Sequence, residues 1–149
     1  MTTREAAAIY ERLGQPVPAA LAEAKASKYR NVKKECDGIL FDSALEARAW
    51  RILKLWEHAG QISALGRQQR FTLQDGYRGS NNIPARRPIY YVADFTFYDE
   101  REKRDRVVDV KGFRTEVFKL KAKLFAARYP LLTLELWTKS QIAAMERGK

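Results

Sequence analysis

The sequence contains very few residues of the kinds that bind soft or transition metals. Its 149 residues include one cysteine, Cys36, and one histidine, His58. A single cysteine excludes an intrachain disulfide and a cysteine-based zinc site, and a single histidine excludes a histidine-rich metal site. A metal ion held by this chain would therefore be bound through oxygen atoms, which favours Mg²⁺ or Mn²⁺.

Long hydrophobic runs are also missing. No segment approaches the roughly 18 consecutive apolar residues of a membrane-spanning helix. The first residues, Met-Thr-Thr-Arg-Glu-Ala, lack the apolar core of a signal peptide. We therefore expect a cytoplasmic protein that does not associate with membranes.

Acidic residues are outnumbered by basic ones. The chain has 28 Lys and Arg residues against 18 Asp and Glu residues, a formal net charge of +10. This excess indicates a polyanionic partner, nucleic acid before a membrane, although a merely solvated basic surface is the alternative. The length suits a single domain with a hydrophobic core of its own.

Hydrophobic periodicity predicts an α/β (α+β) order of helix, three strands, helix, strand. The helices are expected at residues 43–59 and 115–129, and the strands around residues 68–73, 90–98, 107–111 and 131–137. Ser140 can cap a short last helix. We expect the main domain at 28–149, preceded by a helical arm at 1–27 that could serve dimerisation, DNA contact or packing.

The most informative segment is the β-hairpin predicted at residues 90–111. Asp94 lies on its first strand, and Asp109 and Lys111 lie on its second. Side chains two residues apart in a strand share a face, so Asp109 and Lys111 point the same way. Two carboxylates and an ammonium group beside a buried hairpin are costly unless they have partners, and a divalent cation with a polyanionic substrate would offset that cost.

Two charged residues on the predicted helices have both a structural and a functional interpretation. Glu46 completes the pattern Ser43-Ala44-Leu45-Glu46, a capping box in which its carboxylate accepts from the Ser43 amide, yet it also borders the apolar stripe of its helix. Lys121 falls inside the apolar stripe formed by Val117, Phe118, Leu124 and Phe125. Its ammonium group could extend past the aromatic rings to water, or could reach carboxylates or a phosphate.

Basic residues are concentrated in two further segments. Residues 25–34 contain five basic residues and no aspartate or glutamate, and Asp37-Gly38 predicts a hairpin turn just beyond them. This basic segment could bind phosphate or could be a solvated strand of the hairpin. Residues 74–88 are expected to be a long, mobile, net basic loop that contacts DNA, with plain disorder as the alternative. The residues that we expect to contact DNA are Lys28, Tyr29, Arg30, Lys33, Lys34, Arg78, Arg86, Arg87, Arg114 and Lys119.

Glu46 on a helix, followed by Asp94 and Asp109-Val110-Lys111 on a hairpin, resembles the PD-(D/E)xK nuclease superfamily. The wider pattern over residues 28–130 is similar to a phage-encoded family of small nucleases that resemble Holliday junction resolvases. The segments that carry it are Lys28-Tyr29-Arg30-Asn31, Asp37-Gly38, Phe41-Asp42-Ser43, Leu65, Gln68, Phe71, 91–97, 110–112 and 119–125. Ala93 departs from the proline in the superfamily's name.

The resemblance implies a restriction-endonuclease-like core and metal-dependent cleavage of branched DNA, with Mg²⁺ or Mn²⁺ as cofactor. Asp94, Asp109 and the Val110 carbonyl would bind the ion, and Glu46 would bind a second ion or a water molecule. Lys111 would orient the attacking water and stabilise the transition state. Gln68 would position water or phosphate, and Lys121 would compensate charge.

Symmetric cutting of a junction would require a two-fold homodimer. The alternatives are a less selective phage endonuclease that nicks duplex or flapped DNA, a DNA-binding module on the same fold that cuts nothing, and a basic structural protein. The last would leave the hairpin carboxylates unexplained.

Overall fold

The structure is a computed structural model that describes residue 12 and residues 32–111 and 113–148. The expected helical arm, apart from Arg12, and the predicted DNA contacts Lys28, Tyr29 and Arg30 lie outside the described residues. None of the described helices combines the length and the apolar character that crossing a membrane requires.

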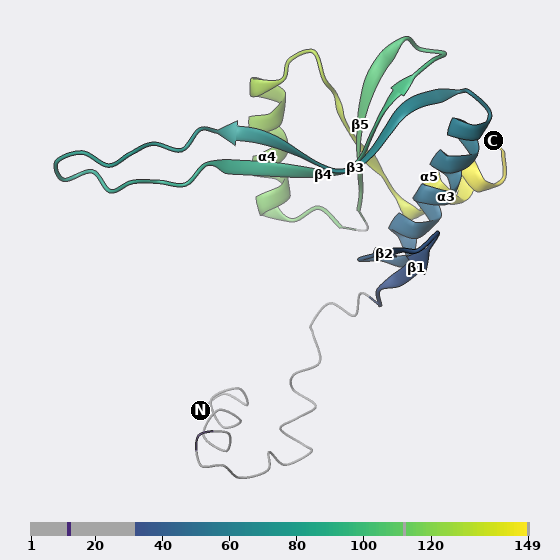
Figure 1. The fold of residues 1–149 in the computed structure, drawn as a ribbon, viewed down its shortest axis with the longest axis horizontal. Coiled ribbons are helices and arrows are strands. Elements are labelled where there is room, and N and C mark those ends of the chain that lie inside the picture. The colour runs from purple at the N-terminus through teal and green to yellow at the C-terminus, as the bar shows by residue number, and fades with distance from the viewer. Residues whose placement is uncertain (1–11, 13–31, 112, 149) are drawn as a thin grey trace.

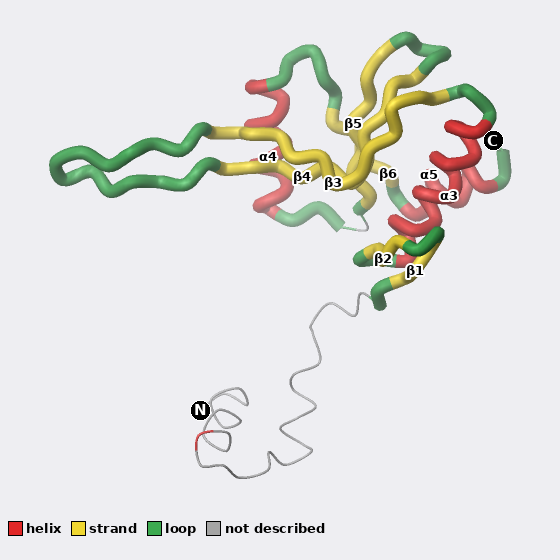
Figure 2. The backbone as a smooth tube through the Cα atoms, in the orientation of Figure 1, coloured by secondary structure: helices red, strands yellow, loops and turns green. Residues whose placement is uncertain are grey.

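A four-stranded mixed sheet forms the centre of the molecule (Figures 1 and 2). Its order is β3 (Ile62–Gln74), β4 (Ile89–Asp99), β5 (Arg104–Val110) and β6 (Leu134–Trp137). The first three strands are antiparallel, and β6 lies parallel to β5. A parallel neighbour requires a crossover connection, which is helix α4 (Glu116–Arg128). The predicted element order and the α+β class are confirmed.

Each face of this sheet has its own hydrophobic core. On one face, helix α3 (Ala44–His58) and helix α5 (Lys139–Glu146) pack against Val108 and Val110 of β5. On the other face, α4 packs against Val107. Successive strand residues point to opposite faces, so the neighbours Val107 and Val108 separate the two cores. The helices therefore flank the sheet on both sides.

A two-stranded hairpin, β1 (Lys34–Cys36) and β2 (Ile39–Phe41), precedes α3. Its turn residues Asp37 and Gly38 have φ angles of 52° and 71°, as expected of the Asp-Gly turn that the sequence predicted. The Asp37 carboxylate accepts a 3.1 Å hydrogen bond from the Trp50 indole, and this bond ties the hairpin to α3.

Three details differ from the sequence-based expectations. Strand β3 begins at Ile62 and is much longer than residues 68–73, because its early residues pair with the far end of β4. Helix α5 is capped by Thr138 and Gln141, which form a capping box, and not by Ser140. Val117 is 64% exposed, so it lies outside the apolar stripe of α4, whereas Phe118 and Phe125 are buried.

Residues 75–88 also differ from the expected loop. They continue β3 and β4 outward as a narrow two-stranded ribbon, which projects from the sheet on the left of Figure 1. Isolated bridges pair Tyr77 with Arg86 and Ser80 with Ile83. We call this segment the arm.

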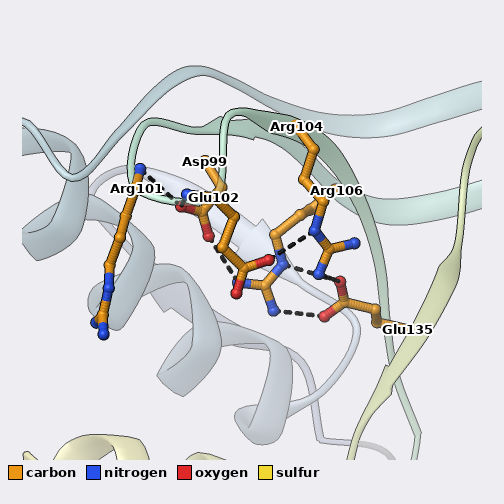
Figure 3. Close-up of polar contacts among 6 residues, drawn as sticks. All are labelled: Asp99, Arg101, Glu102, Arg104, Arg106 and Glu135. Atoms are coloured by element: carbon orange, nitrogen blue, oxygen red, sulfur yellow. Dashed lines mark hydrogen bonds and ion pairs between the residues drawn. The ribbon is translucent and has the colours of Figure 1, made fainter.

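An ion-pair network lies at the turn of the β4–β5 hairpin (Figure 3). Arg106 donates to Asp99 at 3.0 Å and to Glu135 of β6 at 2.8 Å, and its guanidinium lies over the Phe97 ring. Asp99 also accepts the turn amides of Arg101 and Glu102. This network joins three strands at the end of the hairpin away from Asp94 and Asp109.

Candidate active site

The predicted site residues meet where β5 separates from β4. The ladder between these strands ends at the pair Phe95 and Val108, and extending its register by one residue places Asp94 opposite Asp109. There the Val110 amide donates to the Asp94 carboxylate at 2.7 Å instead of to a backbone carbonyl. Beyond this point Lys111 bonds to Trp137 of β6. We call this place, where β4 and β5 separate beside Asp94 and Asp109, the fork. It brings the two carboxylates together.

Strand β4 changes its packing at the same position. Tyr91 and Ala93 belong to the core under α4, whereas Phe95 and Phe97 belong to the core under α3. These four residues share one alternation phase, so the strand must twist strongly at Asp94. The twist places Asp94, which is partly buried, at the boundary between the two cores.

Asp109 and Lys111 form an ion pair inside this fork. Asp109 is 2% exposed, and the Lys111 ammonium lies 2.8 Å from its Oδ2 atom. The same ammonium lies 5.2 Å from the centre of the Phe118 ring, and one third of the Lys111 side chain is exposed. Apart from this ion pair, Oδ2 is aligned with no hydrogen-bond donor among the described residues. The Asp109 oxygen thus retains capacity for another cationic partner.

Burial and like charge perturb the titration of Asp94. Desolvation and the neighbouring Asp109 raise the pKa of Asp94 from 3.8 to about 7, with a further contribution from Glu46, while the Val110 amide and Lys111 act in the opposite direction. Two partly or fully buried carboxylates that repel each other cannot both be ionised cheaply without a compensating cation. The fork is therefore an electrostatically unfavourable site unless positive charge enters it.

Glu46 reaches the edge of the same site from the first turn of α3. Burial is the main cause that raises its pKa, and Asp109 is one of the charges that it experiences. Its carboxylate accepts a 3.1 Å hydrogen bond from the Ser43 hydroxyl, and the Ser43 side-chain oxygen accepts a hydrogen bond from the Glu46 backbone amide. The predicted bond to the Ser43 amide is not formed among the described residues. Capping therefore occupies Oε1 of this carboxylate, and Oε2 accepts no hydrogen bond from the part of the chain that the structure describes.

Gln68 approaches Asp94 from β3. Its side-chain amide lies 3.5 Å from Asp94 Oδ1, at the limit of a hydrogen bond. Gln68 has a φ angle of 50°, which interrupts the regular strand conformation directly beside the fork. This irregularity directs an exposed amide toward the carboxylate pair.

A cavity of about 340 Å³ opens beside the ion pair. Asp109, Lys111 and Lys121 line it together with aromatic residues, so α4 does bring Lys121 to the site as the sequence suggested. Tyr91 also lines it and was missed by the sequence analysis, in which it was only one of several aromatic residues of the hairpin. Within the described residues its buried hydroxyl has no aligned hydrogen-bond partner, and burial together with Asp109 raises the pKa of Tyr91.

The donor set at the fork suits a hard divalent cation. Asp94 and Asp109 supply carboxylate oxygens, and the Val110 carbonyl belongs to the intervening backbone of the same strand. Among the described residues, no group of three or more His, Cys, Asp or Glu side chains forms a complete metal cage. Mg²⁺ is typically bound by one or two carboxylates, with waters and substrate phosphates as its other ligands. The residues present therefore fit that ion.

The remaining predicted DNA contacts lie on separate elements. Lys33 and Lys34 are exposed at the β1–β2 hairpin, and Arg114 is exposed just before α4. Lys119 of α4 forms an ion pair with Glu116 at 2.8 Å. Arg78, Arg86 and Arg87 are on the arm, where the structure leaves all three exposed.

Comparison with known proteins gives a family without an assigned activity. No curated protein and no solved structure matches the chain. The match to a family model covers residues 26–144 and so includes the sheet, the fork and most of α5. The chain belongs to the family described as "Protein of unknown function (DUF1064)".

Proposed function

We propose that this protein is a metal-dependent endodeoxyribonuclease that cleaves branched DNA by hydrolysis of a phosphodiester bond. The observation that carries this proposal is the fork, where buried Asp109 pairs with Lys111 and faces Asp94, whose pKa is raised to about 7. Perturbed carboxylates beside a lysine in an open cavity are typical of catalytic sites. The excess of basic residues supports a polyanionic substrate.

Each residue at the fork has a distinct role in this proposal. Asp94, Asp109 and the Val110 carbonyl would hold Mg²⁺ or Mn²⁺, which when bound supplies Lewis-acid polarisation of the phosphate and neutralises its developing charge. Lys111, held by Asp109 and Phe118, orients the attacking water and donates to a phosphate oxygen as negative charge accumulates there. Gln68 and Glu46 position water at the rim, and Lys121 adds positive charge along the cavity wall.

Preference for a Holliday junction is a narrower proposal, supported by the sequence resemblance to resolvase-like phage nucleases. Resolution of a four-way junction requires two symmetric cuts, so a two-fold homodimer is the arrangement that we propose. A nuclease that nicks duplex or flapped DNA would use the same fork without that symmetry.

Cleavage of a labelled four-way junction, compared with its separate duplex arms, tests this function directly. The reactions contain Mg²⁺, Mn²⁺ or EDTA, and the variants are Asp109→Ala and the control Asp105→Asn, an exposed carboxylate on the same strand. We expect paired nicks in the junction with either metal, no cleavage with EDTA or Asp109→Ala, and full cleavage with Asp105→Asn.

The other outcomes separate the alternatives. Equal cutting of the duplex arms would retain the nuclease and contradict junction preference. Tight binding without cleavage under every metal condition would contradict the nuclease and favour a DNA-binding module. Cleavage that survives Asp109→Ala would show that the fork is not the active site.

A further inference from the structure

The arm has no hydrophobic support from the rest of the chain that the structure describes. Every residue from 74 to 87 is exposed, and the arm extends away from both cores (Figures 1 and 2). Seven residues on each side give a reach of at most about 23 Å beyond the sheet, at about 3.3 Å per residue. An isolated two-stranded hairpin is only marginally stable in water. The shape of the arm is therefore suited to a partner that covers it.

The arm is nevertheless a built ribbon. Tyr77 and Arg86 exchange backbone hydrogen bonds of 3.1 and 3.0 Å, and Ser80 and Ile83 exchange bonds of 3.0 and 2.8 Å. A Cβ atom at Gly79 would lie 2.5 Å from the Ile83 carbonyl oxygen, and one at Gly76 would lie 2.8 Å from Pro88. Because the Ile83 carbonyl blocks a side chain at Gly79 and the Pro88 ring blocks one at Gly76, glycine at these positions allows the two strands to approach so closely. The result is a thin ribbon.

The charge of the arm is one-sided. Arg78, Arg86 and Arg87 are exposed along it, and its one acidic residue, Asp75, is paired with Arg128 of α4 at 3.0 Å. Ile83 at the tip is 54% exposed. A ribbon of this kind combines net positive charge for phosphates with a small apolar end that can contact bases or sugars.

We infer that the arm binds duplex DNA by lying in a groove of the double-stranded segment next to the cleaved phosphate. The major groove, about 12 Å wide, admits a two-stranded β-ribbon. The three arginines would contact the phosphates that border it, and the arm would thereby set where the duplex lies relative to the fork. This inference rests on the proposed function for the position of the cleaved phosphate, but the binding of the arm can be measured without cleavage.

The continuity of the arm with β4 gives it a defined reach. Arg86 precedes Asp94 by eight residues of the same chain segment, which corresponds to at most about 26 Å in extended conformation. At about 3.4 Å per base pair, this distance spans up to about 8 base pairs. Arm contacts should therefore require a duplex flank of about that length beside the cleavage point.

The test measures binding in EDTA to DNA whose duplex flank is lengthened stepwise from about 4 to about 16 base pairs, twice the expected reach. The arm variant is the triple substitution Arg78→Ala, Arg86→Ala and Arg87→Ala. The control removes the same charge from Arg101, Lys103 and Lys54, which are exposed at the turn after β4 and on α3. A third variant, Gly79→Val, keeps every charge but blocks closure of the ribbon.

Wild-type affinity should rise with flank length and level off near 8 base pairs, the reach estimated above. The arm variant should lack that rise, and its plot of log affinity against log salt should be shallower by about 2.7, at about 0.9 per lost phosphate contact. The control should keep both properties, and Gly79→Val should lose the rise although its charge is unchanged. These results together would support the inference.

Equal behaviour of the arm variant and the control would overturn it, because the arginines would then act only through net charge. So would wild-type affinity that is independent of flank length. These outcomes are distinct from failure of the proposed nuclease: a protein that shows arm-dependent binding but never cleaves DNA retains the arm inference and loses the proposed activity.

Discussion

Replacement of Asp94 by asparagine should make the metal-free protein more stable while it abolishes the proposed activity. A pKa raised from 3.8 to about 7 corresponds to about 4 kcal/mol of unfavourable free energy for the ionised form, at about 1.4 kcal/mol per pH unit. Asparagine removes the buried charge and the repulsion from Asp109. It can still accept the Val110 amide through its side-chain oxygen.

The extra stability of Asp94→Asn over the wild type should depend on pH in one direction. Because the folded-state pKa of Asp94 is raised, the folded protein binds a proton that the unfolded chain has already lost between about pH 4 and pH 7. The free energy of unfolding of the wild type should fall across this window relative to Asp94→Asn. The two proteins should be equally stable near pH 4 and differ by up to about 4 kcal/mol at pH 8, an upper value set by the pKa difference.

Urea unfolding in EDTA, followed by tryptophan fluorescence from pH 4 to pH 8, measures this difference. Added Mg²⁺ should then stabilise the wild type at pH 8 by about 2.7 kcal/mol when its concentration is one hundred times the dissociation constant. It should not stabilise Asp94→Asn, and the control Asp105→Asn should behave like the wild type. A variant that is less stable than the wild type at pH 8 in EDTA would refute the electrostatic description of the fork.

Three further predictions concern other residues. Lys111→Met should lower metal-dependent cleavage by at least about 100-fold but keep the stabilisation by Mg²⁺; loss of that stabilisation in calorimetry would contradict a role limited to substrate and water. Glu46→Gln should lower cleavage with little change in stability, whereas Ser43→Ala should cost about 1 kcal/mol of stability and retain cleavage; the reverse pattern in paired unfolding and cleavage assays would assign Glu46 to capping alone. Arg106→Leu should destabilise the protein by about 3 kcal/mol because it removes the ion pairs of Arg106 with Asp99 and Glu135, which leaves Asp99 with only its turn amides and Glu135 with Arg104 at 3.5 Å among the described residues; equal unfolding midpoints for the variant and the wild type in urea would refute this.

Local sequence patterns were sufficient for the order of the elements. The apolar stripe of α3, the Asp37-Gly38 turn and the alternation in β4 each depend on spacing within a short segment, and each is present in the structure. The same spacing placed Asp94, Asp109 and Lys111 on one hairpin. Spacing within a segment did not predict where helices and strands begin, because their pairing and capping partners decide this, as the start of β3 and the Thr138 cap of α5 show.

Long-range geometry decided the rest of the site. Whether Asp94 faces Asp109 depends on the register of β4 with β5 and on the twist that moves β4 from one core to the other. Tyr91 and Lys121 reach the same cavity only because α4 crosses that face of the sheet. No pattern confined to one segment carries this information.

The arm shows the same division. From the sequence, residues 74–88 have the glycines, prolines and arginines of a mobile basic loop, and composition alone determined their charge. Tertiary structure decided that β3 and β4 hold the two ends of this segment in register, so that backbone bonds continue outward and Gly76 and Gly79 permit close pairing. The sequence thus determined which chemical groups are present, and strand pairing decided which of them meet, because side-chain direction depends on partners that are distant in the chain.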